Sequence, residues 1–198
     1  MRQTPLYRWC GAALLMMLAA TWSFTSVGAE PAVTGQARAV QAMTLLSTTV
    51  LADTGTLGGA SDARDATLDS GYVPSMVSGE TMRAVTVGWP DQVVSEASVA
   101  DLNVAIGGTG ISADFIMASA RSALDGGSAA SAEIGNLTVN GVPVMVTGAP
   151  NQLIPILGGR LVLNEQRTSA AGITVNAIHA TVAGMADVVI ASATAGIQ

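Results

Sequence analysis

Alternation of apolar and polar residues with a period of two dominates the chain after residue 86 and predicts strands with one buried face. The clearest example is a pair of segments on either side of a Gly107-Gly108 turn. One face of the first segment carries Leu102, Val104 and Ile106. On one face of the second segment we expect Ile111, Ala113, Phe115 and Met117.

The earlier part of the chain has a less regular pattern. Between residues 36 and 52, apolar residues fall on both alternating faces, which predicts one strand buried on both sides. The alanines there would also suit a helix, but Thr44, Thr48 and Val50 favour β-structure. Residues 53–79 are rich in Gly, Ser and Asp and have no sustained period. We therefore expect a long, mobile surface loop over residues 53–79.

Asn140-Gly141 is the clearest local turn signal, because both residues tolerate the positive φ angles of a type I′ hairpin. Pairing around this turn sets Val139 opposite Val142 and Thr138 opposite Pro143. Proline has no N–H group to donate to a further strand. The second strand of the hairpin should therefore lie at a sheet edge.

The last part of the chain also alternates. Leu161 and Leu163 share one face of a further strand that follows Gly158-Gly159. From residue 173 to 197 the apolar set changes parity near Ala177-Ile178, which predicts a bulge or a bend between two sheets. Several closely spaced strands without an amphipathic helix predict an all-β protein, an antiparallel β-sandwich.

The first 29 residues have the pattern of a signal peptide. Arg2 and Arg8 precede an apolar stretch at residues 11–20, and the small residues Val27-Gly28-Ala29 follow. We expect cleavage between Ala29 and Glu30 and a secreted or cell-surface location. Residues 30–198 are then long enough for a single domain with a sizeable core.

Two alternatives to a cleaved signal fit less well. The apolar run at residues 9–24 is shorter than the ~20 residues that cross a bilayer. Cys10 follows the charged Arg8 closely, whereas a lipidated cysteine follows an apolar run. No later stretch is long enough to span a membrane, and no anchor is visible before Gln198. We expect a protein that is released, or that is held by partners rather than by lipid.

Composition limits the classes of function. The chain is 49% hydrophobic and 11% charged, which is too apolar for intrinsic disorder. Six arginines and 14 acidic residues follow Ala29, giving the predicted mature chain a formal net charge of −8. Together with the absence of lysine, this charge disfavours nucleic-acid binding. The only cysteine, Cys10, leaves with the signal, so a disulfide scaffold is excluded.

Seven short motifs along the chain are similar to those of the choice-of-anchor P family of exported bacterial domains. They are GWPDQVVSEAS (88–98), ISAD (111–114), NLTVNGVP (136–143), GAPNQ (148–152), LNEQ (163–166), TVNAIH (174–179) and DVVIASA (187–193). The resemblance covers nearly the whole predicted mature chain and implies a secreted or cell-surface β domain of unestablished role. Members of the family carry various carboxy-terminal anchors, whereas this chain ends directly after Ile197-Gln198.

Two residues invite a catalytic interpretation. Asp53-Thr54-Gly55 is similar to the aspartic-protease signature, but that chemistry needs two aspartates that share a proton, and one copy would require a homodimer. A strand that ends in an Asp-Thr-Gly turn, which is a common turn composition, is the expectation. His179 is the only histidine, so a Ser-His-Asp triad would recruit distant residues such as Asp187. No Gly-x-Ser-x-Gly elbow presents a serine. We assign no catalytic residue.

Ligand-binding residues are similarly sparse. Asp62, Asp65 and Asp69 could contribute to a weak calcium site, but their spacing matches no EF-hand, and a solvated acidic loop is the expectation. We assign no metal ligand and no cofactor. Trp89, next to Pro90, is the best candidate for a contact residue if its ring is exposed. Packing of that ring over the end of the sandwich is the alternative.

These observations predict a secreted or cell-surface, non-enzymatic structural or interaction module that self-associates through edge strands. Its expected partners are itself or other cell-surface proteins. The alternative is a ligand-binding or adhesion module that uses Trp89 and the loop at residues 53–79. A hydrolase that uses Asp53 or His179 is the third hypothesis.

Overall fold

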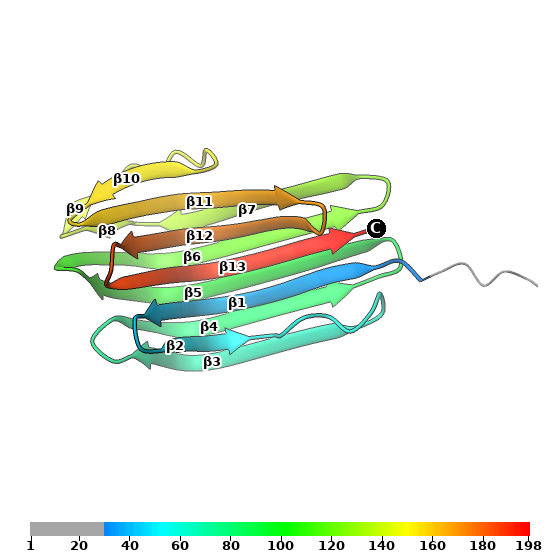
Figure 1. Ribbon diagram of the computed structural model, residues 1–198, viewed down its shortest axis with the longest axis horizontal. Coiled ribbons are helices and arrows are strands. Elements are labelled where there is room, and N and C mark those ends of the chain that lie inside the picture. The colour runs from blue at the N-terminus through cyan, green and yellow to red at the C-terminus, as the bar shows by residue number, and fades with distance from the viewer. Residues whose placement is uncertain (1–29) are drawn as a thin grey trace, which may run out of the picture.

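The computed structural model describes residues 30–198, which form thirteen strands and no helix. Two antiparallel sheets pack face to face, so the predicted all-β sandwich is confirmed (Figure 1). No helix capable of spanning a membrane occurs in this part of the chain. The predicted signal peptide, including Ala29, lies outside the described residues, and Glu30 is the first residue described.

The first sheet has six strands in the order β10-β11-β12-β13-β1-β2. Their bounds are β10 (Gln152–Ile156), β11 (Gly159–Ser169), β12 (Gly172–Val182), β13 (Ala186–Ile197), β1 (Val33–Thr44) and β2 (Thr48–Asp53). The last strand, β13, lies between β12 and β1 and pairs Ile197 with Val33. The two ends of the described chain are therefore joined in one sheet.

The second sheet follows chain order, β3-β4-β5-β6-β8-β9, and β7 also pairs with β6. Its strands are β3 (Ala63–Val73), β4 (Val77–Gly88), β5 (Gln92–Ile106), β6 (Thr109–Ala123), β7 (Gly127–Gly135), β8 (Thr138–Val139) and β9 (Val142–Pro143). Because consecutive strands are joined by short turns, most of this sheet is a run of hairpins.

The core between the sheets contains small and branched aliphatic side chains, with Met82 as one of its largest members. None of the three aromatic side chains in residues 30–198 is buried. A polar bridge joins the two sheets within this core. Thr86 Oγ1 lies 2.7 Å from Ser95 Oγ, and Ser95 donates to the Thr194 carbonyl of the opposite sheet at 2.6 Å. Small side chains let the sheets approach closely enough for this direct contact.

A row of irregular residues crosses the first sheet. At this row the buried side chains move to the opposite alternate positions of each strand that the row crosses, which explains the predicted change of parity. Ala177 and Ile178 are both fully buried, so the change near them is confirmed. The row comprises one residue from each of five strands: Asn164, Ala177, Ala191, Ala39 and Ala52. Asn164, Ala191 and Ala52 have φ angles of 49°, 50° and 47°. Because these five strands change parity on the same line, their pairing register continues on both sides of it.

A similar row crosses the second sheet and corrects one prediction. It comprises Asp69, Thr81, Asp101, Asp114 and Asn136, and pairing of β4 with β5 shifts beside it. Beyond this row β6 buries Ile116, while Phe115 is 41% exposed and Met117 is only partly buried. The prediction that Phe115 and Met117 share a face with Ile111 is therefore wrong. The period-two pattern of residues 111–117 does not indicate the irregular position at Asp114.

Two other predictions for the first half of the chain are wrong. Residues 36–52 form two strands, β1 and β2, separated by a turn in which Leu45 and Leu46 are exposed. Residues 53–79 are not one long loop, because they contain all of β3 and the start of β4. The loop is confined to residues 54–62. As an edge strand β3 has only one buried residue, Val73, which explains why its sequence lacks an apolar period.

The predicted hairpin at Asn140-Gly141 is confirmed. Val139 pairs with Val142 and Thr138 pairs with Pro143, and the turn residues have φ angles of 51° and 74°. Strand β9 lies at the end of the second sheet, as the proline predicts. The expected burial of Leu102, Val104, Ile106, Leu161 and Leu163 is also confirmed.

Candidate functional site

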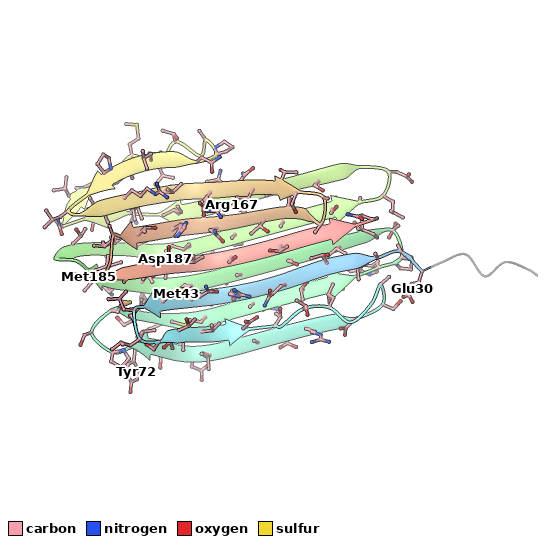
Figure 2. The ribbon with its side chains drawn as sticks, viewed as in Figure 1. Glu30, Met43, Tyr72, Arg167, Met185 and Asp187 are labelled. Carbon is pink, nitrogen blue, oxygen red and sulfur yellow. The ribbon has the colours of Figure 1, made fainter. Side chains whose placement is uncertain are left out.

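The outer face of the first sheet carries a cluster of titratable side chains on three adjacent strands. His179 of β12 lies between Glu165 of β11 and Asp187 of β13. Its Nδ1 is 2.8 Å from Glu165 Oε2, and its Nε2 is 2.9 Å from Asp187 Oδ2. Both ring nitrogens of His179 therefore face carboxylate oxygens. Figure 2 labels Asp187, together with Arg167, which also contacts Glu165.

Glu165 is the centre of this cluster and is only 8% exposed. Asn176 Nδ2 donates to Oε2 at 2.7 Å, and Arg167 Nη2 donates to Oε1 at 2.6 Å. Burial alone would raise the pKa of Glu165. Hydrogen bonds from Arg167 and Asn176, with the charge and hydrogen bond of His179, outweigh burial and hold this pKa below its usual value. The carboxylate is therefore a structural anion that is paired with groups on β11 and β12.

The cluster does not have the arrangement of a hydrolase. Thr181 Oγ1 is 3.4 Å from His179 Nε2, but the Asp187 carboxylate occupies that nitrogen at 2.9 Å. The Thr181 hydroxyl also donates to Asp187 Oδ2 at 3.3 Å. A histidine that deprotonates a hydroxyl needs a free ring nitrogen directed at it. We infer that this cluster fixes three strands together.

The sequence suggested Asp187 as a partner of His179, and the structure brings the two together. Glu165 was missed. It belongs to the motif LNEQ, but only the pairing of β11 with β12 places it beside His179. The alternation of the sequence could have predicted that Glu165 faces outward. Its contact with His179, however, depends on the register between β11 and β12.

Replacing Glu165 with glutamine should lower stability at neutral pH and remove part of the acid sensitivity. The folded-state pKa is lowered, so the carboxylate stabilises the fold above its unfolded pKa near 4.5. That contribution is lost as pH falls through the folded pKa. We expect Glu165→Gln to cost about 1–2 kcal/mol at pH 7 and much less at pH 3, measured by urea unfolding.

Glu133→Gln is the matched control for this prediction. Glu133 is exposed and makes no side-chain hydrogen bond or ion pair within residues 30–198. Its replacement removes the same charge and should change stability at pH 7 by less than ~0.5 kcal/mol. If Glu165→Gln lowered the free energy of unfolding equally at pH 7 and pH 3, the ionised form of Glu165 would make no contribution to stability.

Asp53 anchors the start of the loop at residues 54–62. Its carboxylate lies 3.4 Å from Arg38 Nε and accepts hydrogen bonds from Gln36 Nε2 at 3.0 Å and Gly55 N at 2.8 Å. The buried Thr54 accepts from the Ala37 N–H through Oγ1 at 3.0 Å. The Asp-Thr-Gly motif thereby extends the pairing along β1 and starts the loop at residues 54–62.

The other predicted contact residues lie apart from one another. Trp89, in the β4–β5 connection, is 40% exposed. Asp62 accepts hydrogen bonds from Arg64 at 2.8 Å and from the Gly58 N–H at 2.7 Å, whereas Asp65 and Asp69 lie on β3. Within residues 30–198 no three such side chains form a group that could hold a metal ion.

A feature that the sequence did not predict is a hollow on the outer face of the second sheet, with a volume of about 570 Å³. We call it the second-sheet hollow. A row of residues from five strands crosses it: Tyr72, Ser78, Asn103, Ser112 and Thr138. Each residue pairs directly with the next. The alternation of the sequence could have predicted that each of these residues faces outward. Their alignment in one row, however, depends on the register of four strand pairs.

The free sheet edges differ in their protection. On β7, the Ala130 carbonyl is capped by Gln166 Nε2 of β11 at 2.9 Å. Strands β9 and β10 contain Pro143 and Pro155 respectively. Strand β3 has eleven residues, pairs only with β4 and contains no proline. Among the edge strands of residues 30–198, it is therefore the longest with neither a proline nor a side-chain cap on its backbone.

Comparisons with protein-family models, with curated proteins and with solved structures find no match. The resemblance to the choice-of-anchor P family stays a prediction from the sequence motifs.

Proposed function

We propose that this protein is an exported, non-enzymatic interaction module of the cell surface or extracellular space, and that it self-associates by strand addition at β3. The observation that supports the proposal is the free edge of β3, an eleven-residue strand whose backbone N–H and C=O groups on the side away from β4 are open to a second copy. Export rests on the signal pattern of residues 1–29.

Two features of β3 favour pairing with a second β3. Two identical strands related by a two-fold axis run antiparallel, the only orientation in the sheets of residues 30–198. The strand carries charges of both signs, Arg64 with Asp65 and Asp69, so a second copy does not meet an edge of one sign only. The acidic net charge of the chain opposes less specific aggregation.

A lysine pair on β3 should abolish this association. Thr67 and Leu68 are exposed and point to opposite faces of the edge, so Thr67→Lys/Leu68→Lys places a charge on each face. We expect the parent protein to show a concentration-dependent monomer–dimer equilibrium by sedimentation velocity, and the double variant to remain monomeric with an unchanged circular dichroism spectrum.

The control is Ser98→Lys/Ser119→Lys, which adds the same charge to the central strands β5 and β6. It should associate like the parent protein. A parent protein that stays strictly monomeric at high concentration would overturn the proposal. Loss of association in both double variants would show that added charge, and not the β3 edge, is responsible.

The absence of catalysis is part of the proposal. It is supported by the occupied nitrogens of His179 and by the structural role of Asp53. Hydrolytic turnover that disappears in Asp53→Asn or His179→Ala would overturn it. Ligand binding is a second candidate function, favoured by the second-sheet hollow rather than by Trp89 and the loop that was expected at residues 53–79.

A further inference from the structure

The second-sheet hollow is uncharged, although the chain is acidic. Fifteen residues line it, and none of them is Asp, Glu, Arg or His. Exposed carboxylates lie on the same strands, at Glu80 two residues from Ser78 and at Asp101 two residues from Asn103. An anionic ligand would meet repulsion from these acids without an arginine to offset it. The lining and its surroundings therefore disfavour an anionic ligand.

The floor of the hollow offers both donors and acceptors of hydrogen bonds. The hydroxyls of Ser112 and Thr138 are 2.8 Å apart, and Asn140 Oδ1 accepts from the Gly110 N–H at 2.8 Å. Asn103 Nδ2 makes one long contact of 3.4 Å with the Asp101 carbonyl. Within residues 30–198, Asn103 Oδ1, the Ser78 hydroxyl and the Asn140 amide nitrogen make no hydrogen bond. These groups remain free for a ligand rich in hydroxyls.

An aromatic ring stands at one end of the row. Tyr72, labelled in Figure 2 at the end of β3, is 72% exposed. The partly buried Met76 lines the same end of the hollow. A tyrosine ring offers an apolar face and a polar hydroxyl at low entropic cost, which suits a ligand with both apolar and hydroxylated surfaces.

We propose that the second-sheet hollow binds an uncharged glycan, with a sugar ring stacked on Tyr72 and its hydroxyls bonded to Ser78 and Asn103. A pyranose has an apolar C–H face and a rim of neutral hydroxyls, and so matches the ring and the amide and hydroxyl row. The volume of about 570 Å³ lies in the range of ligand sites.

The shape of the row favours a chain over a single sugar. Five strands spaced by ~4.8 Å give a row about 19 Å long from Tyr72 to Thr138. Its exposed members include Tyr72, Ser78 and Asn103, so the hollow is open to solvent along its length. An oligosaccharide can lie across the strands in such a groove without being enclosed.

The test is a titration of the purified protein with cellohexaose, maltohexaose and chitohexaose, followed by amide chemical shifts. Hexagalacturonate is the charged comparison. We expect at least one neutral hexasaccharide to shift the amides of Ser78, Asn103 and Ser112, and hexagalacturonate to leave them unchanged. Tyr72→Ala and Asn103→Ala should each weaken binding by about fivefold or more.

Trp89→Ala is the matched control, because Trp89 is also a partly exposed aromatic residue but does not line the hollow. It should leave the affinity unchanged. Three outcomes would overturn the proposal: no shift in the row with any neutral hexasaccharide, equal binding of hexagalacturonate, or affinity unaffected by Tyr72→Ala and Asn103→Ala. Sedimentation of the same variants keeps this result separate from the self-association proposed for β3.

Discussion

Replacing Gly159 with alanine is expected to destabilise the protein by about 3 kcal/mol. Gly159 begins β11 and pairs with Val182. A methyl group at this position would lie 1.9 Å from the backbone carbonyl oxygen of Thr181. That oxygen belongs to β12, which is paired on both sides, so it cannot move without disturbing two ladders. The midpoint of urea unfolding should fall while the slope of the transition stays unchanged.

Gly126→Ala is the matched control for this effect. A methyl group there would meet only the Ala123 side chain, at 3.4 Å, and φ is not in the left-handed region. We expect its stability to lie within ~0.5 kcal/mol of the parent protein. Equal stabilities of Gly159→Ala and Gly126→Ala would show that β11 and β12 do not approach as closely as the structure has them.

Replacing Ile190 with alanine should cost about 2–5 kcal/mol. Ile190 is fully buried in β13 and lies between Val40 of β1 and Ile178 of β12, which are fully buried as well. These three strands form the centre of the first sheet, so neighbouring side chains cannot collapse into the cavity. The loss should appear as a lower urea midpoint.

Val189→Ala provides the internal comparison, since Val189 is the neighbouring residue on the opposite face. It lies beside Gln41 and His179 on the outer surface. We expect a loss of less than about 1 kcal/mol. Because β13 changes parity between Ile190 and Ala191, Ala191 is also buried. If Val189→Ala lowered stability more than Ile190→Ala, the change of parity in β13 would not lie where the structure has it.

Turn chemistry and regular alternation were readable directly from the chain. Asn140-Gly141 tolerates the backbone angles of its turn, and Pro143 cannot extend a ladder, so the hairpin and its edge position followed from local properties. The parity change near Ala177 was equally visible, because two adjacent apolar residues interrupt a period of two. Errors arose where burial was slight, as along β3, or where apolar side chains stood in a turn, as at Leu45 and Leu46.

The candidate sites could not be obtained in the same way. Glu165, His179 and Asp187 are separated along the chain, and their contact exists only because β11, β12 and β13 pair in one particular register. The row from Tyr72 to Thr138 likewise needs four pairings to align. A shift of one residue in any of them would turn those side chains to the opposite face.

By itself, the sequence determined the all-β class, the main turns and which side chains are buried in the regular strands, because period-two alternation and turn preferences act over a few residues. Strand order, the rows of irregular residues across both sheets, the pairing of β1 with β13 and the second-sheet hollow were decided only by the tertiary structure. These features depend on register between distant segments, and register is set by the packing of the whole core.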